Sequence, residues 1–216
     1  MAVGTGLGEA DKAPITIGAS QIDHMDVFRY LGSHIDDTGR SSYDIGMRIA
    51  AASKAFGALR EPVFTNPHLS TRTKHLVFGA CVLSVLLYGS ECWVPLQRDV
   101  RRLSAFYNGC IRSILGIRKS DVRSIRLTTA DLLSLWGDER QIPTILLQRR
   151  LEWLGHVARM PEHRMPKTIL FSMLRPRPPH LLDPANGGKI VCDQICNHSA
   201  HSGWYETAQS RPTWRA

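Results

Sequence analysis

Four residues near the C-terminus, Cys192, Cys196, His198 and His201, form the one cluster in the sequence whose types could bind a metal ion. Thiolate sulfur and imidazole nitrogen are the ligands that zinc takes in structural sites. Only one residue separates Cys196 from His198, which is tighter than the usual spacing between ligand pairs. A polar tail that merely contains these residues is the favoured interpretation, and zinc binding stays open.

Carboxylates offer a second kind of chemistry, and Asp36-Asp37 is the adjacent pair that could attract a metal. Thr38 and Gly39 follow directly, and this composition is typical of a turn. Two-metal catalysis needs carboxylates that converge from separate strands. The sequence also contains no glycine-rich phosphate loop, nucleophile elbow or zinc-protease motif. We therefore predict no catalytic residue, no metal site and no small-molecule substrate in this chain.

Basic residues are concentrated in the middle of the chain. The formal net charge is +8, and residues 41–180 hold 21 basic and 10 acidic side chains. Such an excess raises the local concentration of polyanions and favours contact with phosphates. Solubility alone is the alternative explanation.

Four arginines share one side of a helix predicted over about residues 97–115. Apolar side chains recur every three or four residues from Val100 to Ile114, and Gly116 ends the pattern. Within an arc of about 100° on the opposite side lie Arg98, Arg101, Arg102 and Arg112. Phosphate binding by this face and simple solvation of it are both consistent with the pattern.

A second helix is predicted over residues 142–159, and Arg149 and Arg159 share one of its sides as weaker candidates for phosphate contact. Arg150 falls on its apolar side and therefore needs a partner.

The remaining pattern predicts a mainly α fold: a helical bundle after a short antiparallel β-hairpin, with a poorly ordered tail. Residues 1–13 read as a disordered leader, and 14–35 as one β element that the following turn extends to residue 40. A first helix begins near Ser41 and is expected to end at Pro62. Ser70 is expected to cap a second helix, and Thr128-x-x-Asp131 resembles a capping box.

The cysteines and the hydropathy pattern indicate an intracellular protein, nuclear or cytoplasmic. Cys81, Cys92 and Cys110 lie within apolar helical patterns, which favours a reducing compartment over a disulfide scaffold. No secretory signal is visible, and the longest apolar stretch, 76–88, is too short to span a bilayer.

Several motifs, taken in order, resemble the C-terminal part of the reverse transcriptases of LINE-type (non-LTR) retrotransposons. They begin with Phe28-Arg-Tyr30-Leu31-Gly32-Ser33 and continue through Asp37-Thr-Gly39 and 45–59. Further matching segments lie at 81–93, 103–117 and 149–161, including Leu87-Tyr88-Gly89-Ser90-Glu91. The resemblance covers residues 14–174 well and the tail poorly.

The resemblance implies roles for these segments. Phe28, Tyr30, Leu31 and Gly32 would form the primer grip, a hairpin at the edge of the palm that positions the 3′ end of the growing strand. Residues 41–116 would form a thumb-like helical bundle and 117–174 a helical segment beyond it, followed by an irregular tail over 175–216. The implied partner is an RNA–DNA template–primer duplex.

In this family the catalytic carboxylates and their Mg²⁺ belong to a palm core that is expected upstream of these motifs. We therefore expect no polymerase activity from this polypeptide alone and no cofactor in it. A helical protein–protein interaction module without a nucleic-acid role is the alternative function.

Overall fold

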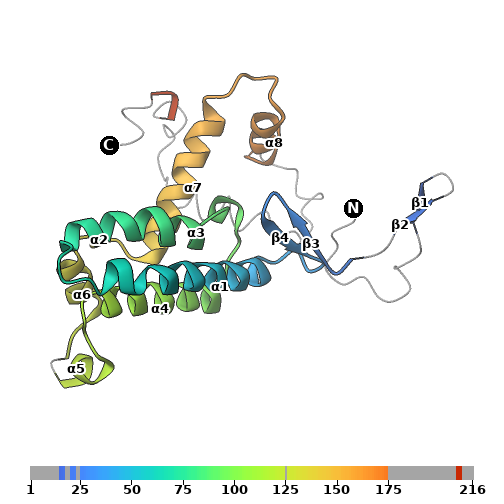
Figure 1. The fold of residues 1–216 in the computed structure, drawn as a ribbon. Helices are drawn as coiled ribbons and strands as arrows, with labels where there is room; N and C mark the ends of the chain where they lie inside the picture. Colours follow the sequence, from blue (N-terminus) through green and yellow to red (C-terminus); the bar gives the residue numbers. More distant parts are fainter. Residues whose placement is uncertain (1–14, 18–19, 23–24, 125, 175–207, 211–216) are drawn as a thin grey trace. The chain divides into compact units, whose positions relative to one another are not determined.

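The structure is a computed structural model, and it describes residues 15–17, 20–22, 25–124, 126–174 and 208–210 (Figure 1). It confirms the predicted fold class, because helices dominate the described residues and follow a short antiparallel β region. The chain divides into two compact units. The first comprises Met1–Gly89 and Pro95–Thr144, and the second comprises Ser90–Val94 and Ile145–Ala216.

The β region contains two hairpins, not the single β element that the sequence predicted. Strand β1 (Ile15–Ile17) pairs with β2 (Ser20–Ile22), and β3 (Val27–Tyr30) pairs with β4 (Ser33–Asp36). The prediction of one β element over residues 14–35 did not separate these two hairpins.

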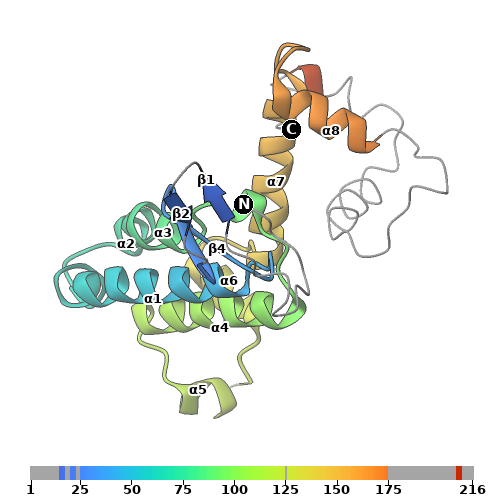
Figure 2. The same ribbon diagram turned by 90° about the vertical axis from the view of Figure 1, so that its right-hand side faces the viewer.

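The helices of the first unit follow β4. They are α1 (Ser42–Leu59), α2 (Thr71–Val77), α3 (Ser84–Leu86), α4 (Gln97–Ile114), α5 (Lys119–Ser124) and α6 (Thr129–Trp136). A π-helical turn, η2 (Arg60–Phe64), extends α1, and another, η3 (Phe78–Leu83), joins α2 to α3. Helix α7 (Ile142–Ala158) begins in the first unit and continues into the second, where α8 (Met165–Leu174) follows. Figure 2 shows the same elements from a second direction.

Pro62 does not end the first helix as predicted. Helical winding continues through η2 to Phe64, and the Thr65 amide donates to the Arg60 carbonyl, five residues earlier, at 2.8 Å. Proline lacks the amide hydrogen that an α-helical turn needs, and a wider π turn is one way for a helix to accommodate this loss.

The predicted signals at three helix ends are confirmed. The Ser70 side chain accepts a hydrogen bond from the Thr73 amide at 3.1 Å. Thr128 and Asp131 form the reciprocal capping box at the start of α6. Gly116 follows α4 with a φ of +70°, the left-handed conformation that glycine adopts readily after a helix.

Aromatic rings form the core of the first unit around Phe78. The Phe78 ring meets Phe64 and Trp136 edge-on, with centroids 6.2 and 5.7 Å away, and is tilted against Tyr107 at 5.9 Å. All four side chains are buried. Such pairs add about 0.5–1.5 kcal/mol each beyond the burial of their surface. This core connects η2, η3, α4 and α6, and it fixes the helices that carry the candidate site.

In the second unit, Leu154, Val157 and Ala158 of α7 are buried. Ala208, in the short described part of the tail, is buried as well. The neighbouring Gln209 side chain donates to the Ala158 carbonyl at 3.2 Å, so residues 208–210 contact the end of α7. Among the described helices, none combines the length and the apolar character needed to cross a bilayer.

Candidate nucleic-acid interface

The turn between β3 and β4 has an unusual backbone. Leu31 and Gly32 form its two central positions, with φ values of +48° and +87°. A two-residue type I′ turn requires positive φ at both positions, and asparagine followed by glycine is its preferred sequence. Leucine is strained in this left-handed region, because its Cβ comes too close to the following carbonyl oxygen. Its side chain is nevertheless 76% exposed, so packing of that side chain does not compensate for the strain.

The same hairpin exposes two aromatic rings beside Leu31. Phe28 and Tyr30 lie two residues apart on one face of β3, and they are 39% and 57% exposed. Their rings are stacked, with centroids 6.5 Å apart and an interplanar angle of 25°. Exposed aromatic faces of this kind are platforms on which nucleobases stack.

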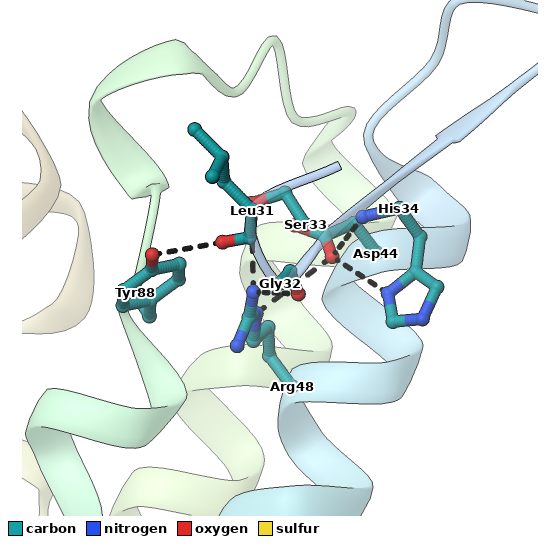
Figure 3. A network of polar contacts seen from close by, with 7 residues as sticks. All are labelled: Leu31, Gly32, Ser33, His34, Asp44, Arg48 and Tyr88. Carbon is teal, nitrogen blue, oxygen red and sulfur yellow. Dashed lines mark hydrogen bonds and ion pairs between the residues drawn. The ribbon is translucent and has the colours of Figure 1, made fainter. Parts of the chain in front are cut away.

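Two residues from outside the hairpin hold its tip (Figure 3). The Tyr88 hydroxyl donates to the Leu31 carbonyl oxygen at 2.9 Å. The Arg48 guanidinium, from α1, donates to the Gly32 carbonyl oxygen and lies 3.4 Å from the Ser33 hydroxyl. Arg48 also lies over the Tyr88 ring, 4.5 Å from its centroid. The carbonyls of two successive peptides, Leu31–Gly32 and Gly32–Ser33, are therefore bonded to one stacked pair of side chains.

Asp44 fixes the base of this network. It is buried in the first turn of α1, and its carboxylate accepts from the His34 amide at 2.9 Å. The same oxygen lies 3.2 Å from the His34 ring nitrogen Nδ1 and 3.7 Å from Arg48 Nε. Asp44 thus ties strand β4 to α1 and orients Arg48.

Sequence reasoning placed Phe28, Tyr30, Leu31 and Gly32 in one hairpin but assigned no role to Asp44, Arg48 or Tyr88. The spacing of Asp44 and Arg48, four positions apart on a predicted helix, was a signal for their ion pair. The contact of Tyr88 with Leu31 joins residues 57 positions apart, and no local sequence pattern predicts such a contact.

The four arginines of α4 differ in their surroundings. Arg98 and Arg101 are exposed, and Arg112 is half-buried. Arg102 is also exposed, but its guanidinium pairs with Asp99 one turn earlier, at 3.4 Å. Of these four arginines, the contacts among the described residues pair only Arg102 with a carboxylate.

Asp99 joins the beginnings of two helices. It is fully buried, and its other carboxylate oxygen accepts from the Ser42 hydroxyl at the start of α1, at 2.7 Å. Helix α1 also holds the hairpin through Asp44 and Arg48. The bond between Ser42 and Asp99 therefore places Arg98, Arg101 and Arg102 at the end of the α1–α4 pair that carries the β3–β4 hairpin.

The two candidate arginines of the second unit make contacts within the chain. Arg149 pairs with Glu91 at 3.3 Å, and Arg159 donates to the Ala208 carbonyl at 2.7 Å. Arg150, expected to need a partner, is buried and donates to the Trp93 carbonyl at 2.8 Å. Its burial lowers the pKa of the guanidinium from its ordinary value. These bonds hold the segment around Glu91 and Trp93 against α7.

No group of three or more His, Cys, Asp or Glu side chains could hold a metal ion within the described residues. The proposed zinc ligands Cys192, Cys196, His198 and His201 lie outside those residues. Asp36 serves the predicted turn, because its carboxylate accepts from the Thr38 hydroxyl at 2.8 Å and from the Arg40 amide at 3.0 Å. Cys110 is a free, buried thiol, and burial raises its pKa to about 12.

The chain is 28% identical over 171 residues to a Caenorhabditis elegans protein described as an uncharacterized transposon-derived protein. The match covers 77% of this chain and 60% of that protein, so the chain spans less than two thirds of its relative's length. No protein-family model and no solved structure matches the chain. The similarity points to an origin in a transposable element.

Proposed function

We propose that this chain is part of a LINE-type reverse transcriptase and that it binds the RNA–DNA duplex of template and primer. In this proposal the described residues hold the duplex, and the Mg²⁺-dependent chemistry belongs to a palm domain. Such a protein acts on nucleic acid inside the cell, in the nucleus or the cytoplasm.

The observation that carries the proposal is the strained and exposed tip of the β3–β4 hairpin. A leucine held at positive φ with its side chain in solvent is costly for folding, and such strain is found most often at functional sites. Tyr30 and Phe28 beside it offer apolar surface for the bases or sugars at the end of a strand.

The arginines of α4 support the same function. Exposed guanidinium groups bind phosphate oxygens through paired hydrogen bonds. Arg98 and Arg101 lie at the same end of the α1–α4 pair as the hairpin, through the bond between Ser42 and Asp99. One end of this helix pair therefore presents both charge for the backbone and apolar surface for the bases.

The test is binding of the purified chain to a labelled RNA–DNA hybrid with a recessed DNA 3′ end, titrated at several salt concentrations. We expect affinity to fall steeply with salt, because each neutralised phosphate releases a counterion. A chain that is folded by circular dichroism and binds no hybrid at low salt would refute the proposal.

Protein–protein interaction is the second candidate function. Met25, Phe28, Tyr30, Leu31 and Ile35 give the hairpin an exposed apolar surface, and such surfaces also serve to dock proteins. An interaction module of this kind leaves the arginines solvated and gives no salt-sensitive binding of the hybrid.

A further inference from the structure

The left-handed conformation of Leu31 needs a source of stabilisation. Its side chain is largely exposed, and the hairpin that contains it has only two short strands. An isolated two-stranded hairpin is marginally stable in water. Among the described residues, Tyr88 and Arg48 reach the tip from other elements, through their bonds to the two turn carbonyls.

We propose that Tyr88 and Arg48 are positioning residues that fix the Leu31–Gly32 turn, so that Leu31 and Tyr30 meet the end of a bound strand. This inference rests on the proposed function, because it assigns the hairpin tip to the nucleic acid. Tyr88 and Arg48 themselves act through the turn.

Each of the two side chains bonds to a different carbonyl of the turn. Tyr88 bonds to the carbonyl of Leu31, and Arg48 bonds to the carbonyl of Gly32. Together these bonds fix the orientation of two successive peptides, the one that links Leu31 to Gly32 and the one that follows Gly32. The stacking of Arg48 on Tyr88 holds each against the other, and the buried carboxylate of Asp44 holds Arg48 from the other side.

A purely structural role is the competing explanation, in which the same bonds only attach the hairpin to α1. The two explanations predict different effects when the tip of the hairpin becomes slightly less ordered. Loss of attachment lowers the melting temperature alone, whereas loss of positioning also changes how the protein distinguishes a strand end from a continuous duplex.

The experiment compares two probes. One is an RNA–DNA hybrid with a recessed DNA 3′ end, and the other is the same hybrid closed by a loop at both ends. The ratio of the two affinities measures recognition of the end and is independent of the phosphate contacts common to both probes. Melting temperature is measured for every variant.

Two variants remove the proposed contacts without removing a charge. Tyr88→Phe retains the ring beneath Arg48 and loses the hydroxyl that reaches Leu31. Arg48→Lys retains the positive charge and loses the planar guanidinium fork. Tyr43→Phe is the matched control, because Tyr43 is an exposed tyrosine whose ring contact with His34 a phenylalanine preserves.

We expect wild type to prefer the recessed end, and Tyr88→Phe to lower the affinity ratio about fivefold, the factor that one hydrogen bond of ordinary net strength represents. Arg48→Lys should lower the ratio at least as much, and Tyr43→Phe should leave it unchanged. A lower melting temperature with an unchanged ratio in both variants would overturn the positioning roles and leave the proposed function standing. A wild type that binds neither probe would overturn both proposals.

Discussion

At the scale of single residues, Leu31 combines strain with exposure. Asparagine tolerates the left-handed region better than leucine, so Leu31→Asn should raise the free energy of unfolding by about 1 kcal/mol. The same substitution removes the exposed apolar side chain and should weaken binding to a recessed 3′ end. Urea denaturation and hybrid titration measure the two effects. A variant that is more stable and binds equally well would show that the Leu31 side chain contacts no nucleic acid.

Gly89 limits how the hairpin packs against the segment after α3. Its φ is +71°, and a Cβ added there would lie 2.9 Å from the Ser33 hydroxyl oxygen. Gly89→Ala should therefore destabilise the protein by about 1–2 kcal/mol from the backbone alone, with the close contact in addition. The double variant Gly89→Ala, Ser33→Ala should regain the contact part of the loss in urea denaturation. Equal stability of the single and double variants would show that Ser33 is not crowded.

Asp138 makes folding stability depend on pH. Hydrogen bonds from the Arg140 side chain lower the pKa of Asp138 below its ordinary value of 3.8, and the charges of Arg140 and His75 lower it further. A lowered folded pKa means that this contribution to stability is present above the ordinary pKa and is lost as the pH falls through the folded pKa.

Wild type should therefore be more stable than Asp138→Asn at about pH 6, and the difference should shrink between about pH 4 and about pH 2. Urea denaturation across this range gives the difference, with Glu139→Gln as the control for removal of a neighbouring exposed carboxylate. A difference that stays constant down to the lowest pH would contradict the assignment.

At the scale of elements, the arginine face of α4 can be tested separately from the hairpin. Reversal of Arg98, Arg101 and Arg112 to glutamate leaves Arg102 in place to pair with the buried Asp99. If all three contact phosphates, the plot of log affinity against log salt should become shallower by roughly 3.

The matched control reverses Arg60, Arg72 and Arg126, three exposed arginines of the same unit, for the same change in net charge. It should weaken binding through the general field and make the slope shallower by much less than the α4 variant does. Equal slopes in both triple variants would mean that α4 makes no specific phosphate contacts.

Sequence patterns predicted elements best where one local rule determines the structure. Helix α4 was predicted almost to the residue, because a helical apolar period runs along it and Gly116 terminates it. The prediction that Pro62 ends the first helix was wrong, because a π turn accommodates the missing amide hydrogen.

The candidate site was predictable only in part. The family resemblance placed Phe28, Tyr30, Leu31 and Gly32 in one hairpin, and the helical period placed the arginines on one side of α4. The bonds from Tyr88 and Arg48 to the turn depend on tertiary packing, which joins residues remote in sequence. Leucine also carries no turn signal of its own, so the positive φ of Leu31 could not be read from its residue type.

At the scale of the whole molecule, the net charge and the exposed aromatic rings contribute to binding in different ways. The chain carries +8, and its excess of basic residues lies within 41–180. Charge alone attracts any polyanion, and this attraction is screened as salt rises. Stacking on exposed rings depends much less on salt.

These two contributions predict how selectivity changes with salt. At low salt an RNA–DNA hybrid and a B-form DNA duplex of equal length and equal ends should compete almost equally, because phosphate attraction dominates both. As salt rises, preference for the hybrid should increase, since the A-like groove geometry and the rings at the hairpin tip contribute more of the remaining affinity. Competition titrations at several salt concentrations, with heparin as a polyanion that has no bases, measure this directly. A ratio of the two affinities that stays near one at every salt concentration would mean that the basic side chains attract nucleic acid only non-specifically.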